Sequence, residues 1–156
     1  MAVFIDHSNN EIYLGHLKAS GTAYPGDMVY ADDSAGTATV PKTTDVAGGF
    51  DLYLVANYDS YADTDMTDSE DFYVADGEYL RLKALSAGEE ITTDRFIGTY
   101  ASISVDDIFT INSSTADGTQ GKWVAIAALD PVVRAKVVEK SAIYGNDALK
   151  LRVLRA

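Results

Sequence analysis

Apolar and polar residues alternate along two segments near the end of the chain, 132–138 and 149–154. The apolar series consists of Val133, Ala135, Val137, Leu149, Leu151 and Val153. A period of two is typical of a β-strand with one buried face. Residues 144–147 (Tyr-Gly-Asn-Asp) lie between the two segments and have the composition of a hairpin turn. We therefore predict a β-hairpin over 132–154, whose outward Lys and Arg side chains form a basic face or protect a sheet edge.

Further short segments have the composition of strands and recur about every 10–15 residues. They cover residues 11–17, 27–31, 50–58, 72–75, 78–85, 108–111 and 122–129. Asp76-Gly77 is a strong turn signal between two of them. Ten Tyr, five Phe and many Val, Ile and Thr residues favour strands over helices. This spacing predicts eight or nine strands arranged as a sandwich or barrel.

The helix signal is weak along the whole chain. No stretch of 11 residues has apolar positions at helical spacing, so we expect short helical turns at most, near 92–96 and 104–108. Segments 32–49, 59–71 and 112–121 are polar and are predicted to be long loops. The predicted fold is a single all-β, mainly antiparallel domain over residues 1–156, with residues 1–10 as an N-terminal arm.

The net charge of −12 is unevenly distributed. Residues 1–80 hold 15 acidic and 2 basic side chains, whereas residues 131–156 hold 2 acidic and 6 basic ones. An acidic surface repels nucleic acid and anionic membranes, so we expect neither as a partner. The asymmetry favours different partners for different parts of the surface, although acidic side chains also keep a protein soluble.

Several classes of site lack the residues they need. The chain has no Cys, which excludes disulfides, thiol nucleophiles and Cys-based metal sites. The longest apolar run, 123–129, is far short of the roughly 20 residues that cross a bilayer. The N-terminus has no basic region before its short apolar stretch, so it does not have the pattern of a secretory signal.

Catalytic patterns are also missing. His7 and His16 have no Gly-x-Ser-x-Gly turn to accompany them. Adjacent acids occur at 32–33, 89–90 and 106–107. On strands such neighbours point to opposite faces, so they do not converge as glycosidase carboxylates must. Segment 118–122 resembles a phosphate-binding loop only superficially, because Ala116 and Trp123 occupy required Gly and Ser/Thr positions. We expect no catalytic residues and no cofactor, and hence not an enzyme.

Two features of the sequence allow more than one interpretation. The acidic segment 59–71 contains six Asp or Glu residues, which suit either a solvated loop, a basic partner or a calcium ion, although the EF-hand spacing is absent. No metal ligand is assigned there. The ten Tyr residues suit protein interfaces, the rim of the core, or stacking against carbohydrate.

Several strings resemble those of small virion proteins of tailed bacteriophages. They are Ala23-Tyr-Pro-Gly-Asp-Met-Val29, Gly77-Glu-Tyr-Leu-Arg-Leu-Lys83, Gly88-Glu-Glu-Ile-Thr-Thr-Asp-Arg-Phe96, Ala135-Lys-Val-Val-Glu-Lys140 and Ala148-Leu-Lys-Leu-Arg-Val-Leu154. The chain is similar in style to head decoration proteins, also called cement proteins, over about two-thirds of its length. Gly-Asp-x-Val turns occur in many β proteins, and no single residue carries a function across.

The resemblance implies a non-enzymatic protein, made in the host cytoplasm, that binds the outer surface of the capsid. The major capsid protein would be its partner, and a homo-oligomer, most often a trimer, its state. Many symmetry-related contacts would stabilise the shell by avidity. We expect residues 1–17 and the hairpin 132–154 to be the contact surfaces.

Two other classes stay open. A tail-spike or fibre-type glycan-binding module would present exposed Tyr and Trp123 with Asp and Asn nearby. A carboxylate-based hydrolase would need two converging acids in a cleft.

Overall fold

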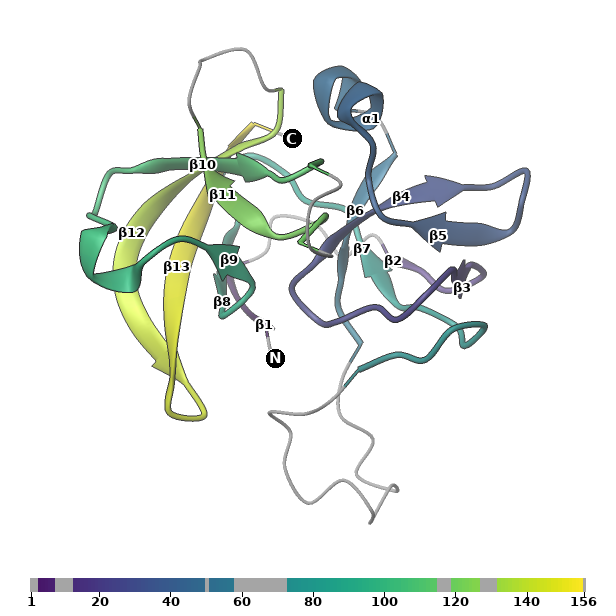
Figure 1. Cartoon of the computed structure of the whole chain (residues 1–156), viewed down its shortest axis with the longest axis horizontal. Helices are drawn as coiled ribbons and strands as arrows, with labels where there is room; N and C mark the ends of the chain where they lie inside the picture. Colours follow the sequence, from purple (N-terminus) through teal and green to yellow (C-terminus); the bar gives the residue numbers. More distant parts are fainter. Residues whose placement is uncertain are drawn as a thin grey trace.

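The computed structural model describes residues 3–7, 13–49, 51–57, 73–114, 119–126 and 132–155, and its strands form two β-sheets (Figure 1). The seven-stranded sheet has the order β1 (Val3–His7), β8 (Glu90–Thr93), β13 (Asn146–Arg155), β12 (Arg134–Ile143), β10 (Ile108–Ile111), β11 (Trp123–Ala125) and β9 (Phe96–Ile97). The six-stranded sheet has the order β2 (Tyr13–Leu14), β7 (Leu82–Lys83), β6 (Leu52–Val55), β4 (Met28–Asp32), β5 (Thr37–Thr39) and β3 (Lys18–Ala19).

Antiparallel pairing dominates both sheets, as the sequence predicted. Only β9–β11 and β3–β5 pair in parallel among the described strands. The helical elements are α1 (Thr43–Gly48) and the 3₁₀-helix η2 (Tyr100–Ser102). Within the described ranges, no helix is long and apolar enough to span a membrane. The all-β fold class is therefore confirmed, with more and shorter strands than expected.

The main hydrophobic core lies where the two sheets pack against each other. Trp123 and Phe109 from the seven-stranded sheet share this core with Met28 and Leu54 from the six-stranded sheet. A second core contains Val29 and other residues of the six-stranded sheet together with residues 74–82. Neighbours on a strand point to opposite faces, so β4 and β6 supply side chains to both cores. This is why consecutive apolar residues occur there in place of a simple alternation.

A buried ion pair joins the two sheets beside β8. The Lys83 ammonium lies 2.7 Å from Glu89 Oε1, and both side chains are fully buried. The second carboxylate oxygen of Glu89 accepts a hydrogen bond from the Ser86 amide at 2.6 Å, and Lys83 Nζ also donates to the Ala84 carbonyl. Every charge is thus met by a partner, as burial of ionised groups requires.

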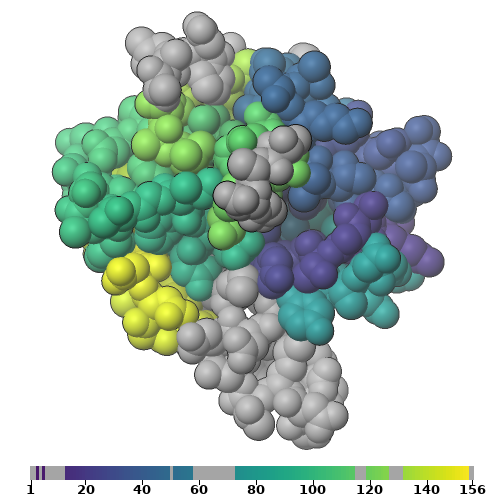
Figure 2. All heavy atoms as spheres, in the orientation of Figure 1, coloured from purple at the N-terminus to yellow at the C-terminus, as the bar shows by residue number. Residues whose placement is uncertain are grey.

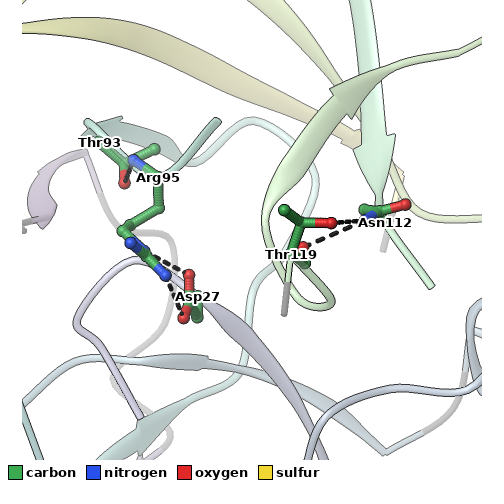
Figure 3. Close-up of polar contacts among 5 residues, drawn as sticks. All are labelled: Asp27, Thr93, Arg95, Asn112 and Thr119. Carbon is green, nitrogen blue, oxygen red and sulfur yellow. Dashed lines mark hydrogen bonds and ion pairs between the residues drawn. The ribbon is translucent and has the colours of Figure 1, made fainter. Parts of the chain in front are cut away.

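A second buried ion pair joins the sheets at the other end of β8 (Figure 3). Arg95 donates from Nε and Nη2 to the two carboxylate oxygens of Asp27, at 2.7 and 3.0 Å. The guanidinium also stacks on the Tyr24 ring, 4.4 Å from its centroid. Burial raises the pKa of the Asp27 carboxyl, and the hydrogen bond and charge of Arg95 oppose that rise. The two ion pairs hold β8 against the six-stranded sheet from both ends.

The predicted C-terminal hairpin is confirmed as β12 and β13, ten residues each, joined at Tyr144-Gly145. Both turn residues have positive φ, 49° and 82°, as a type I′ turn requires. Because β12 also pairs with β10, and β13 with β8, the hairpin lies inside the sheet. Its Lys and Arg side chains therefore form a face and do not protect an edge.

Other local predictions were wrong. Residues 92–96 contain the end of β8 and the start of β9 in place of a helical turn, and residues 104–108 form one hydrogen-bonded turn before β10. Segment 32–49, predicted to be a loop, contains β5 and α1. Only Leu82–Lys83 of the predicted strand 78–85 is a strand, although the Asp76-Gly77 turn is present.

Candidate partner-binding face

Of the two segments that the sequence singled out for contacts, the hairpin 132–154 and the first strand of segment 1–17 lie in one sheet, whereas Tyr13–Leu14 of that segment form β2 of the six-stranded sheet. β1 and β13 flank β8, with Ile5 and Leu151 both paired to Ile91. The row continues across the sheet, since Arg152 pairs with Glu90 on one side and with Lys136 on the other. Residues more than a hundred positions apart in the chain therefore contribute to one continuous surface.

The outer side of the hairpin carries what we call the hairpin face. It consists of Arg134, Lys136, Lys150, Arg152 and Leu154, with Glu90 from β8. These hairpin residues alternate with fully buried ones such as Ala135 and Leu151, which fixes their outward direction. Leu154 is 43% exposed, an apolar group among the charges.

Lys136 and Arg152 face each other directly across the strands, an arrangement that like charges disfavour. Two carboxylates compensate it. Glu90 accepts hydrogen bonds from Arg152 Nε and Nη2 at 2.9 and 2.7 Å, and Asp106 lies 3.3 Å from Lys136 Nζ. The hydrogen bond from Arg152 lowers the pKa of Glu90. Three cations of the hairpin face thus share two carboxylates, since Lys150 also lies 3.7 Å from Glu90 Oε2.

β1 is the edge strand of the seven-stranded sheet. Its Val3 and Ile5 side chains pack against the main core, so the strand is part of the domain and the predicted arm is at least partly docked. Among the described strands only β8 pairs with β1, and an edge strand of this kind is the part of a sheet to which an extended segment can add.

The His and Asp residues that were considered as catalytic or metal-binding candidates make local structural contacts. His16 Nε2 lies 3.0 Å from Asp33 Oδ1 in an exposed pair, whereas the side chain of His7 lies outside the described residues. Asp32 accepts hydrogen bonds from Ser34 Oγ and Ala35 N in a turn. Asp107 likewise accepts a hydrogen bond from the Ser104 amide.

The two acids of each adjacent pair bind different partners, but only Asp32 and Glu90 belong to strands, so strand geometry is not the reason. In the described ranges no group of three His, Cys, Asp or Glu residues could hold a metal ion. The acidic segment 59–71 lies outside those ranges.

The segment before β11 forms a strand-entry turn. Asn112 Nδ2 donates to the carbonyl and hydroxyl oxygens of Thr119, at 3.1 and 2.9 Å (Figure 3). Gly121 passes so close to β4 that an added Cβ would lie 2.5 Å from the Met28 carbonyl oxygen. Trp123 is fully buried, and its Nε1 has no hydrogen-bond partner in the part of the chain that the structure describes. Trp123 therefore cannot belong to an exposed glycan patch.

The sequence did not predict the two inter-sheet ion pairs. Asp27 and Arg95 are 68 positions apart, and Lys83 and Glu89 belong to segments whose pairing depends on the sheets. The one available signal was a Lys at a strand position between apolar neighbours. Comparisons with protein families, with curated proteins and with solved structures found no match to this chain.

Proposed function

We propose that the chain is a non-enzymatic structural protein of a phage virion that binds the outer surface of the capsid and stabilises the shell. The observation that carries the proposal is the shared sheet, in which β1 and the hairpin face flank β8. A cationic surface in the same sheet as an edge strand suits a partner that offers acidic side chains and an extended segment.

The energetics of such contacts fit a decoration protein. Exposed charge pairs contribute about 0–1 kcal/mol each, so the hairpin face supplies orientation more than affinity. Strand addition at β1 would add backbone hydrogen bonds whose strength does not depend on side-chain identity. Repetition over many equivalent capsid sites would then turn modest contacts into stable coverage.

The test is co-sedimentation with capsids that lack this protein. The double substitution K136E/R152E reverses two charges of the hairpin face and should reduce occupancy about tenfold or more at physiological salt. The matched control K18E/K42E makes the same change in net charge on the six-stranded half. If both variants bind like the unmodified chain, the hairpin face is not the contact surface.

Deletion of residues 1–10 tests the strand edge. Because the described side chains of β1, Val3 and Ile5, are only partly buried against the main core, the shortened chain should keep its β-sheet circular dichroism spectrum while losing capsid occupancy. Full occupancy by the folded deletion variant would contradict a role for β1.

Self-association belongs to the same proposal. We propose a trimer at the local three-fold positions of the shell, with the major capsid protein as the partner. Sedimentation equilibrium in solution and on-capsid stoichiometry measure this state. A strictly monomeric chain, both free and on the capsid, would contradict it.

A further inference from the structure

The six-stranded half carries a second surface, unrelated to the hairpin face. Segments 13–24 and 73–83 run antiparallel as an irregular two-stranded ribbon. Its pairs include Tyr13 with Lys83, Lys18 with Tyr79, and Ala23 with Val74. Figure 2 shows the purple residues of the first segment against the teal residues of the second on the molecular surface. We call this surface the tyrosine ribbon.

Four Tyr rings lie along the ribbon, and each is held by a neighbouring group. Arg81 lies over the Tyr13 ring at 4.1 Å, and Lys18 over the Tyr79 ring at 5.1 Å. Tyr24 stacks under Arg95 and meets Tyr73 edge-on, with 6.3 Å between ring centroids. The rings are therefore oriented before any ligand arrives.

Two of these rings are also open to solvent. Tyr79 is 59% exposed and Tyr73 is 46% exposed, on either side of the Asp76-Gly77 turn. Most aliphatic side chains of the ribbon point the other way, into the second core. Those that are no more than 7% exposed are Leu17, Ala19, Ala23, Val74, Leu80 and Leu82. Leu14 is half-buried against the same core, and Ala75 is exposed. Apart from the Ala75 methyl group, the exposed apolar surface thus consists mainly of separate tyrosine rings surrounded by polar and charged groups.

This composition decides between two kinds of ligand. The centre of a protein interface is a contiguous apolar patch from which water is excluded, and the ribbon offers none. A sugar ring has one small apolar face of polarised C–H groups and a rim of hydroxyls. The C–H face suits the negative π surface of a fixed ring, and the rim suits neighbouring polar groups.

Polar groups are present at the right place. Asn57 is bonded to the backbone of Tyr79 and Arg81, which fixes its side chain beside the ribbon. Lys18 supplies an exposed cation over the Tyr79 ring, and Glu78, the chain neighbour of Tyr79, supplies an exposed carboxylate. We propose that the tyrosine ribbon is a carbohydrate-binding site, in which Tyr79 and Tyr73 stack against pyranose rings.

The experiment is saturation-transfer NMR on the full chain with four trisaccharide probes. Maltotriose, cellotriose and chitotriose are neutral, and a glucuronate-containing trisaccharide is acidic. We expect at least one probe to bind with a Kd on the order of 1 mM, and Y79A and Y73A to weaken it about tenfold. Y79F keeps the ring and should bind like the unmodified chain.

Y144A is the matched control, because Tyr144 is 49% exposed but lies at the hairpin tip, away from the ribbon. Binding of the acidic probe alone, lost in K18M, would assign the site to acidic saccharides. The proposal is overturned if no probe binds, or if Y79A and Y144A bind equally well. Capsid occupancy of Y79A should be unchanged, so this result is separate from the capsid proposal.

Discussion

Glu89 and Glu90 are neighbours in the chain and bind partners on opposite sides of it. Glu89 accepts a hydrogen bond from Lys83 in the interior, at 2.7 Å, whereas Glu90 accepts one from Arg152 on the hairpin face, also at 2.7 Å. Substitutions at these two positions therefore separate a buried contact between the sheets from an exposed contact within one sheet.

The substitution E89Q should destabilise the fold strongly. It leaves the Lys83 ammonium buried without a counter-charge, which costs about 3–5 kcal/mol. Urea unfolding followed by Trp123 fluorescence measures the change. The double variant K83M/E89M removes both charges and should cost less than E89Q, and a larger loss in the double variant would contradict this account.

The substitution E90Q should change how stability depends on pH. Arg152 lowers the pKa of Glu90 from its ordinary value of 4.5, so the stabilisation is complete above that value and disappears as the pH falls through the folded pKa. The difference in Tm between the unmodified chain and E90Q should therefore be largest at neutral pH and shrink as the pH falls below 4.5. A constant difference over that range would show that the ion pair is not responsible.

Gly121 and Gly145 have nearly the same backbone conformation, with φ of 88° and 82°, but different surroundings. An added Cβ meets the Met28 carbonyl oxygen at Gly121 and nothing within 4 Å at Gly145. G145A should cost about 1–2 kcal/mol from the left-handed conformation alone. G121A should cost about 1–3 kcal/mol more through overpacking, and equal losses in chemical denaturation would refute the steric explanation.

The hairpin turn offers a stabilising substitution. Tyr144 has φ of 49°, a conformation that Asn adopts more easily than Tyr, and Asn-Gly is the preferred pair in a type I′ turn. Y144N should therefore stabilise the fold by about 0.5–1 kcal/mol. A lower Tm in differential scanning calorimetry would mean that contacts of the Tyr144 side chain outweigh the turn preference.

Local patterns predicted what local interactions determine. The alternation around Val137 and Leu151 gave the hairpin, because one face of each strand is buried and the other is not. Between Met28 and Val29, or Leu54 and Val55, both faces are buried, so the alternation disappears and the strand limits were misjudged.

The helix α1 shows a second limit. It has six residues and buries only Val46, with Gly49 closing it in a left-handed conformation. Such a short helix depends on its tertiary contacts more than on its propensity, and its small polar residues resemble a loop. The inter-sheet ion pairs could not be predicted for the same reason, because no local sequence pattern indicates which distant charged residue Asp27 will pair with.

The order in which the chain is made gives one consequence of placing β1 beside β8. The six-stranded sheet uses residues 13–83 and has all its strands once that stretch has been synthesised. By contrast, β1 can pair only after its partner strand Glu90–Thr93 has been synthesised. That strand, β8, can pair with β13 only after the last ten-residue strand has been synthesised. Pairing between segments that are distant in the sequence is slow, so we expect the newly made chain to fold in two stages. The residues that are synthesised first would then be among the last to form their native strand pairing.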